Sequence, residues 1–175
     1  MSARFWALER ATAQANSAYN GGPLPCHPAG GQYRGKSRSS VSLTKTCRDV
    51  IVGAILGDAC LERNGKHVRL RIDHGHHQQA LVEWKYRQLA ELTPSPPRRV
   101  EVYDPRTHKT YIHFRFASRT IEALDEYFDL FYGSSGVKCV PENIATYLNS
   151  ALSIAVWYMD DGGRRGDCRS GYFNT

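Results

Sequence analysis

Two glycines and a terminal acid within one short apolar stretch restrict the fold of this chain more than any other feature. The letters IVGAILGDA at residues 51–59 place apolar side chains at the three- and four-residue spacing of a buried helical face. Gly53 and Gly57 lie four residues apart, and each should destabilise a helix by about 1 kcal/mol relative to alanine. Close approach of a second helix backbone is the usual compensation. We therefore expect this helix to pack tightly against another helix.

A second stretch repeats the pattern near the end of the chain. Residues 152–163 read LSIAVWYMDDGG, again an apolar helix that ends in acid and glycine. In the first stretch, Asp58 falls in the last helical turn, where the helix dipole opposes a negative charge and a neighbouring cation would reverse the penalty. Either acid alone could simply cap an exposed helix end, but the repeated placement favours a shared function.

Composition indicates a globular protein. The 175 residues are enough for one domain with additions, and 41% apolar and 23% charged residues are ordinary for a folded chain. No apolar run approaches the 18 residues of a membrane span, and the first residues lack the apolar core of a secretory signal, so we expect no membrane association. The net charge of +6 and the pI near 9.2 fit a polyanionic partner and an unpartnered basic protein equally well.

The cysteines carry information about the compartment. They are odd in number, widely spaced and never in a C-x-x-C pair, at Cys26, Cys47, Cys60, Cys139 and Cys168. This pattern indicates neither a zinc ribbon nor a disulfide framework. Reduced thiols in an intracellular compartment fit it best, and both an organelle (mitochondrion or chloroplast) and the bacterial cytoplasm stay open.

The first elements follow a stretch at 1–43 that is rich in Gly, Pro and Ser and that we interpret as a flexible basic arm. Thr44 is a suitable N-cap for a helix that reaches about residue 58. Asn64-Gly65 between two alternating runs then predicts a β-hairpin. In its second strand, one face should pack in the core and consists of Val68, Leu70 and Ile72. The other face consists of Arg69, Arg71 and Asp73, and its arginines would offer positive charge to a partner.

Three further segments complete this unit. A helix at 79–92 is predicted to end at prolines, and its apolar positions are Ala80, Leu81, Trp84, Leu89 and Leu92. Residues 98–103 and 111–117 are alternating strands joined by a polar Asp-Pro turn, and 120–131 is an amphipathic helix. In the second hairpin we expect a core face and an opposite surface, with Ile112, Phe114 and Phe116 on the first and His113, Arg115 and Arg99 on the second.

Three histidines follow the first hairpin. His74, His76 and His77 are expected in a turn with no carboxylate at ligand spacing, so the more economical interpretation is that no metal binds there. A connection over 133–149 leads to the second acid-ended helix, and Tyr172 with Phe173 should begin one further strand. The predicted class is therefore α+β, with one antiparallel sheet whose polar face is rich in Arg, His and Tyr.

The two acid-ended helices predict a metal site where they meet. One complete two-hairpin unit separates Asp58 from Asp161, and side-by-side packing through Gly53 and Gly57 would bring both acids to the same end of the interface. Two carboxylates with water and phosphate oxygens form a hard oxygen site for Mg²⁺. Such an ion polarises a phosphodiester and activates water, as an enzyme that cuts DNA requires.

The segments IVGAILGDA and WYMDDGG resemble the paired signature helices of the LAGLIDADG homing endonuclease family, especially its monomeric two-motif branch encoded in omega-type mobile introns. The likeness covers about 46–175 and includes the SPP after the second helix, the K-x-x-P before the second motif and the terminal FNT. It implies an αββαββα unit within 44–149, followed at 150–175 by the second signature helix and the start of a second unit. The antiparallel sheet would lie in the major groove of a long double-stranded DNA site.

The resemblance also implies an active site. The last acids of the two signature helices, Asp58 and Asp161, would bind Mg²⁺ or Mn²⁺ at the scissile phosphates. The backbone of Ala59 and of Gly162 would be additional ligand candidates, and Asp160 would have a supporting role.

The resemblance also implies roles for residues of the connection and of the strands. Lys138, in KCVP, matches the lysine that family members use near the active site to stabilise charge or to position water. The strands that would face DNA carry Arg69, Arg71, Arg99, His113 and Arg115, and a groove-facing strand supplies both phosphate and base contacts.

The family pattern predicts more chain than follows the second motif. A two-motif member needs a second sheet domain of roughly 100 residues after its second helix, and far fewer follow Asp161. We therefore expect a C-terminally truncated chain that lacks half of the sheet and the counterpart of Lys138. The intact two-motif protein should be a monomer.

The leading functional prediction is a site-specific, Mg²⁺-dependent double-strand DNA endonuclease of the homing type, a hydrolase of phosphodiester bonds. An RNA-binding intron maturase is the first alternative, in which the same arginines would contact intron RNA. A non-catalytic nucleic-acid-binding module or remnant is the second.

Overall fold

The computed structural model describes residues 41–166 and 169–174. The predicted arm at 1–43, apart from its last residues, lies outside this part of the chain, as do Cys26 and Cys168. Among the described residues, Cys47, Cys60 and Cys139 are free thiols.

The glycine-containing helix lies at the centre of the core. Helix α2 (Lys45–Leu56) begins at Thr44, whose hydroxyl accepts a hydrogen bond from the Cys47 amide at 3.1 Å, as the sequence predicts for the cap. All of its residues from Asp49 to Ile55 are buried. A helix that is covered on all sides belongs to the interior of a domain. Its position there explains the apolar run.

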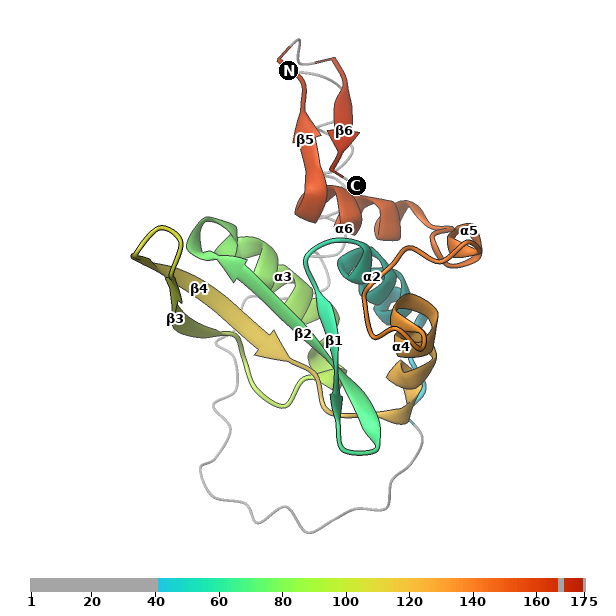
Figure 1. The fold of residues 1–175 in the computed structure, drawn as a ribbon. Helices are drawn as coiled ribbons and strands as arrows, with labels where there is room; N and C mark the ends of the chain where they lie inside the picture. Colours follow the sequence, from blue (N-terminus) through green and yellow to red (C-terminus); the bar gives the residue numbers. More distant parts are fainter. Residues whose placement is uncertain (1–40, 167–168, 175) are drawn as a thin grey trace, which may run out of the picture. The chain divides into compact units, whose positions relative to one another are not determined.

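Four antiparallel strands form the sheet in the order β1-β2-β4-β3 (Figure 1). The first hairpin joins β1 (Cys60–Asn64) to β2 (His67–Gly75), and Asn64 pairs with His67, so its turn is Gly65-Lys66. Gly65 has φ of 70°, a conformation that glycine adopts without steric cost. The second hairpin joins β3 (Arg98–Asp104) to β4 (Lys109–Ala117), as predicted.

The helices cover one face of this sheet. Helix α3 (Gln79–Gln88) packs on β2 and β4, and α4 (Asp125–Tyr132) packs on β2. Short 3₁₀ turns lie beside them at His76–Gln78, Ala90–Leu92 and Glu122–Leu124. Strand β2 alternates strictly, and its inward side chains are Val68, Leu70, Ile72 and His74. The element order αββαββα and the α+β class are confirmed.

The buried side of α3 and its following turn is only partly the predicted one, because Leu89 and Leu92 are buried and Trp84 packs on the core as expected, but the rest of the face differs. Val82 and Lys85 are the buried residues of this helix, whereas Ala80 is exposed. The α-helix ends at Gln88, and the 3₁₀ turn that follows buries Leu92. Val82, Lys85 and Leu89 have helical spacing, but a lysine within such a stripe ordinarily indicates solvent, so the sequence pattern concealed the true face.

The position predicted for Arg99 is wrong. In the β3–β4 register Arg98 lies opposite Arg115, whereas Arg99 lies opposite Phe114. Residues directly opposite each other in an antiparallel pair share a face. Arg99 therefore lies on the same face of the sheet as Phe114, and Arg98 lies with Arg115 on the other. A strand register slip of one residue exchanges the two faces, and no pattern in this charged strand fixed the register.

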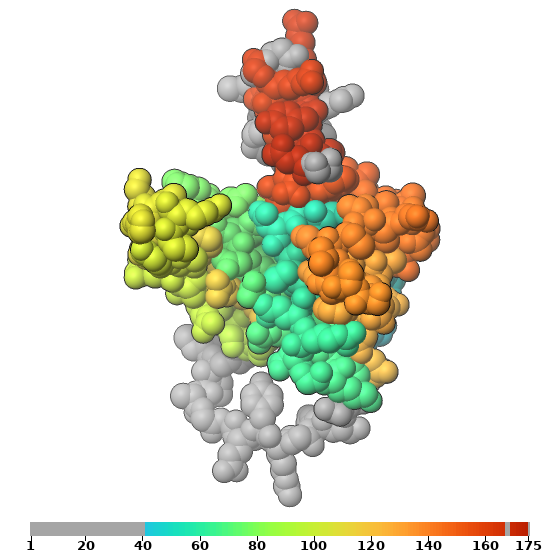
Figure 2. Space-filling view, viewed as in Figure 1, coloured from blue at the N-terminus to red at the C-terminus, as the bar shows by residue number. Residues whose placement is uncertain are grey.

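The last elements extend from the sheet domain. The connection contains a short helix, α5 (Ile144–Tyr147), and leads to α6 (Ala151–Asp161), which packs along α2. Figure 2 shows the connection in orange as a continuous surface beside the teal residues of the first hairpin. A hairpin of β5 (Gly162–Arg164) and β6 (Gly171–Phe173) follows α6, so the further strand is confirmed. No helix in 41–166 or 169–174 is long and apolar enough to span a membrane.

Candidate active site

The α2–α6 interface is formed at two glycines. A Cβ atom on Gly53 would lie 2.3 Å from the Ser153 carbonyl oxygen and 2.8 Å from the Val156 Cβ. A Cβ atom on Gly57 would lie 2.4 Å from the Cβ of Asp160. Neither position has room for a side chain, so the glycines allow the close helix contact that their spacing predicts. The same contact brings the C-terminal ends of the two helices together.

Asp58 directly follows Gly57, the C-cap residue of α2. Its carboxylate is about half exposed, and its Oδ2 atom lies 3.3 Å from Nδ1 of His74. Hydrogen bonding to His74 lowers the pKa of Asp58, against the opposing effect of burial. The Asp58 amide points toward α6 and donates to Oδ2 of Asp160 at 3.4 Å. Asp58 is thus ionised, reachable from solvent and anchored to the second helix through its backbone.

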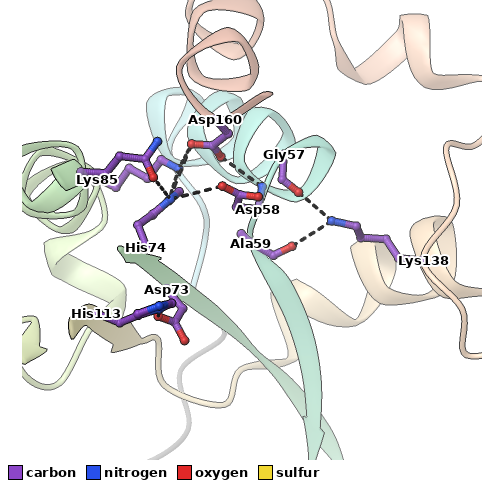
Figure 3. Close-up of polar contacts among 10 residues, drawn as sticks. Gly57, Asp58, Ala59, Asp73, His74, Lys85, His113, Lys138 and Asp160 are labelled. Carbon is purple, nitrogen blue, oxygen red and sulfur yellow. Dashed lines mark hydrogen bonds and ion pairs between the residues drawn. The ribbon is translucent and has the colours of Figure 1, made fainter. Parts of the chain in front are cut away.

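Asp160 lies inside the interface, in contact with a lysine of α3 (Figure 3). Its Oδ1 atom is 2.5 Å from Nζ of Lys85, and both side chains are completely buried. Burial raises the pKa of Asp160 and lowers that of Lys85, because removal from water penalises both charged forms, and their mutual attraction opposes this. Asp160 was expected to support the metal, but the structure places its carboxylate against Lys85 and Gly57.

His74 connects this buried pair to Asp58. The Nζ atom of Lys85 lies 3.1 Å from His74 Nε2, while His74 Nδ1 lies 3.0 Å from the Gln78 side-chain oxygen. The lysine donates to Nε2, so the ring proton is on Nδ1 and points toward Gln78 and Asp58. The prediction of a turn position without a nearby carboxylate is wrong for His74, which is the inward residue at the end of β2. We name Asp160, Lys85 and His74 the buried cluster.

Asp161 ends α6 and faces the same end of the interface as Asp58. Burial raises the pKa of Asp161, and the negative charge of Asp58 raises it further, whereas Lys138 lowers it. The backbone carbonyl of Asp161 accepts from the Asn174 amide at 2.9 Å, and the Phe173 ring contacts Trp157 with centroids 4.2 Å apart. The terminal hairpin therefore holds the end of α6 in place.

Lys138 reaches the end of α2 from the connection. Its ammonium group donates to the carbonyl oxygens of Ile55, Gly57 and Ala59 at 3.0, 2.7 and 3.3 Å. The last carbonyls of a helix have no intrahelical partner and carry the negative end of the dipole, so a cation stabilises them. The carbonyl of Ala59, one of the expected additional ligands, is thus already bonded to Lys138. The backbone amide of Gly162 donates a hydrogen bond to the backbone carbonyl oxygen of Tyr158.

The acids at the helix ends fit a hard divalent cation with few protein ligands. Within the described residues there is no group of three or more His, Cys, Asp or Glu side chains arranged to hold a metal ion. Asp58 and Asp161 provide carboxylate oxygens that repel each other, which a cation would relieve. Mg²⁺ accepts such a site because it keeps several waters and takes substrate phosphate oxygens as further ligands. His76 and His77 lie apart from this site and are exposed.

The predicted DNA-facing cations are paired with acids. Arg69 and Arg71 contact Glu62, and His113 and Arg115 contact Asp73. Arg99 contacts Glu101 on the other face. Sequence alternation identified the cations of β2 and β4 but not these pairings, because the partner of each cation depends on the register.

The comparisons with known proteins agree with this geometry. Residues 48–175 match the LAGLIDADG DNA endonuclease family. The chain belongs to this family. The match runs from α2 to the end of the chain and includes both acid-ended helices. The resemblance to LAGLIDADG homing endonucleases seen in the two motifs is therefore confirmed.

Individual LAGLIDADG relatives are longer than this chain. DNA endonuclease I-ChuI of Chlamydomonas applanata is 32% identical over 131 residues, covering 70% of this chain and 60% of I-ChuI. Cytochrome b mRNA maturase bI2 of Debaryomyces hansenii is 30% identical over 131 residues, or 71% of this chain and 48% of the maturase. The homing endonuclease I-WcaI, in a structure bound to its DNA recognition sequence, has a TM-score of 0.62 and 25% identity over 71% of this chain and 54% of its own.

Three site residues escaped the sequence analysis of this LAGLIDADG chain. Lys85 lies in the segment predicted only as a covering helix, Gln78 directly precedes that segment, and His74 was assigned to a turn. A signal for Lys85 exists, since it is the single charged residue within the spacing of Val82 and Leu89. A signal for His74 also exists, because it continues the alternation of inward residues in β2.

Proposed function

We propose that this LAGLIDADG chain provides one DNA-binding sheet and both acidic helix ends of a homing endonuclease that cuts double-stranded DNA at a long specific site by divalent-metal-dependent phosphodiester hydrolysis. The observation that carries this function is the α2–α6 contact at Gly53 and Gly57, because it brings Asp58 and Asp161 to one end of the interface. The similarity to I-ChuI and to the DNA-bound I-WcaI supports it.

Asp58 and Asp161 would hold Mg²⁺ or Mn²⁺. When bound, such an ion polarises the scissile phosphate and lowers the pKa of a coordinated water. Asp58 is kept ionised by His74 and by the nearby charge of Lys138. Lys138 also fixes the backbone around Asp58 through its three carbonyl contacts, and its ammonium charge would stabilise negative charge on a phosphodiester bound beside the two acids.

The sheet would contact DNA with the face that the helices leave uncovered, which we name the open face. The register places basic side chains from three strands on it, namely Arg69, Arg71, Arg98, His113 and Arg115. A twisted two- or four-stranded sheet places such side chains within reach of base edges and phosphates of the major groove. Arg99, on the other face, is no longer part of the proposed surface.

A plasmid assay tests the proposed activity on this chain joined to a second sheet domain, because the chain alone is expected to supply one of the two sheets. The substrate is a pool of supercoiled plasmids with randomised inserts, incubated with Mg²⁺ or with EDTA, and the products are sequenced at their new ends. We expect Mg²⁺-dependent nicked or linear plasmid with ends enriched for one long sequence. Asp58→Asn and Asp161→Asn should each abolish cutting while DNA binding is retained. Cutting that survives both substitutions would contradict the function.

An RNA-binding intron maturase is the second candidate, favoured by the 30% identity to maturase bI2 over most of this chain. In that function the open-face arginines would contact intron RNA, and the acids at the helix ends would be dispensable. Binding of a structured intron RNA that is tighter than binding of duplex DNA, and that is unchanged in Asp58→Asn/Asp161→Asn, would favour the maturase over the endonuclease.

A further inference from the structure

Two clusters on the open face share one arrangement, in which a single carboxylate contacts two basic side chains. Glu62 accepts from Nε of Arg69 at 2.9 Å with its Oε2 atom, and its Oε1 atom lies 2.5 Å from Arg71. Asp73 accepts from Nε of Arg115 at 2.8 Å with Oδ2, while His113 Nδ1 lies 2.9 Å from Oδ1. Figure 3 shows Asp73 and His113 next to each other below the buried cluster.

The strand register places both acids on the open face. Glu62 lies directly opposite Arg69, and Asp73 lies directly opposite Arg115. The neighbours of Asp73 in β2, Ile72 and His74, are buried on the other face. Glu62 and Asp73 are therefore acids within the surface that we propose for DNA. The alternation of β2 predicted this face for Asp73, but neither acid was predicted to have a role there.

Stability does not account for two acids in this position. Ion pairs between partly exposed side chains contribute little to folding stability, because both charges remain hydrated when the pair is broken. Each carboxylate also repels the phosphate backbone and neutralises a cation that could otherwise bind it, so both acids weaken sequence-independent affinity. A surface selected only for tight DNA binding would omit them.

The two acids are explained by their effect on the orientation of the arginine side chains that they bind. In Arg69 and Arg115 the Nε atom and one terminal nitrogen contact the acid, so the guanidinium plane is fixed and the remaining N–H donors have a set direction. A guanidinium held in one plane loses less entropy when it forms the paired hydrogen bonds that a base edge requires. Contact with a phosphate needs no such fixed direction, because phosphates are present at every position of the duplex.

We propose that Glu62 and Asp73 are positioning residues for DNA sequence discrimination, which hold their arginines for base-edge contacts and reduce binding to non-target sequences. This inference rests on the proposed function, since it assumes that the open face contacts DNA. Glu62 and Asp73 act through the cations that they hold, and the predicted signature of their loss is tighter but less selective binding.

The test uses isosteric neutral variants of the full chain, Asp73→Asn and Glu62→Gln. Glu101→Gln is the matched control, because Glu101 binds Arg99 at 2.9 Å in the same sheet but on the opposite face. Binding is measured by fluorescence anisotropy against a pool of duplexes of one length with a randomised centre, over a series of KCl concentrations. The bound fraction is sequenced to give the base preference at each position.

For Asp73→Asn and Glu62→Gln we expect several-fold tighter binding of the unselected pool. The dependence of log Kd on log[KCl] should steepen by about one unit for each cation released to phosphate. The base preference should flatten at the positions read by Arg115 or by Arg69 and Arg71. Glu101→Gln should change none of these quantities. A partly unfolded variant would bind more weakly, so misfolding cannot produce the expected gain.

Pool affinity and base preference that are both unchanged, or pool binding that weakens, would overturn the inference. Arg115→Ala and Arg69→Ala separate this failure from failure of the proposed function. If the arginine variants lose affinity while the acid variants bind as the unmodified chain does, the open face contacts DNA and only the positioning role is wrong. If the arginine variants also bind normally, the open face does not contact DNA and both proposals fail.

Discussion

The buried cluster and the Asp73 cluster have matching composition but opposite surroundings. Each combines an aspartate with one basic side chain and one histidine, Asp160 with Lys85 and His74, and Asp73 with Arg115 and His113. His74 and Asp73 are neighbours in β2 and point to opposite faces of the sheet. The side chains of the buried cluster are 0% exposed, whereas those of the Asp73 cluster are 19–29% exposed.

This difference in burial determines what each cluster can do. Charges removed from water depend on each other, so the loss of one partner leaves the other uncompensated. Charges at the surface are hydrated whether or not they are paired, and their contacts can be exchanged for those of a ligand. The buried cluster is therefore suited to fix α6 against the sheet domain, and the Asp73 cluster to meet a partner.

Removal of the buried cation should have the largest effect. Lys85→Met leaves the Asp160 carboxylate buried without its cation, and we expect a loss of about 3–5 kcal/mol of unfolding free energy at neutral pH. Urea denaturation measures it. The penalty should shrink as the pH falls, because burial already raises the pKa of Asp160 and protonation removes the stranded charge.

A double variant provides the control for this effect. Lys85→Met/Asp160→Asn has no stranded charge and keeps an acceptor for the Asp58 amide, so it should recover part of the stability. A loss below about 1 kcal/mol for Lys85→Met, which is the scale of a surface pair, would show that burial does not distinguish the two clusters.

The histidines of the two clusters, His74 and His113, allow a direct comparison of stability, with smaller expected losses than for Lys85→Met. His74→Ala removes a fully buried ring that contacts Lys85 and Gln78, and we expect a loss of about 2–3 kcal/mol. His113→Ala removes a partly exposed ring, for which a loss of less than about 0.5 kcal/mol is expected. Thermal and urea unfolding of the two variants measure the difference. Equal losses would contradict the assignment of separate roles.

Much of the fold, and part of the site, could be predicted from the sequence. The glycine spacing predicted the contact of α2 with α6, and the Asn-Gly signal and the alternation of β2 predicted the first hairpin and its faces. Asp58, Asp161 and Lys138 were identified through motifs, and their roles stay predictions. These features depend on residues close in sequence.

The remainder depends on contacts that no local pattern contains. Lys85 was missed because a buried lysine becomes possible only when Asp160, far along the chain, supplies its charge partner. Arg99 was assigned to the wrong face because β3 has exposed residues on both faces, so its alternation does not specify the register. Glu62 and Asp73 were not recognised as partners of the arginines for the same reason.

A substitution at Gly57 tests the close contact of α2 with α6 on which the buried cluster depends. Gly57→Ala places a Cβ 2.4 Å from the Cβ of Asp160, and the resulting displacement should cost about 1–2 kcal/mol despite the usual preference for alanine. Gly75→Ala is the matched control, because Gly75 has φ of −60° and open space around its Cβ position. Urea denaturation should show a loss only for Gly57→Ala. An equal or greater stability of that variant would refute the close contact.

The smallest effect is expected on the open face. Asp73→Asn should change the unfolding free energy by less than about 1 kcal/mol, because Arg115 and His113 stay hydrated when the carboxylate is neutralised. The measurement is the urea midpoint at neutral pH. A loss comparable with that of Lys85→Met would mean that the Asp73 cluster is also part of the structural core.

The central claim is that the helix contact assembles a cation site from Asp58 and Asp161 while Asp160 serves the interface. Titration of the DNA-bound chain with Mn²⁺, followed by electron paramagnetic resonance, tests it directly. We predict that Asp58→Asn and Asp161→Asn each weaken Mn²⁺ binding by more than about tenfold. Lys85→Met/Asp160→Asn, which leaves no stranded charge in the interface, should keep Mn²⁺ binding within about twofold, because the Asp160 carboxylate faces Lys85. Unchanged Mn²⁺ affinity in Asp58→Asn and Asp161→Asn would contradict the account.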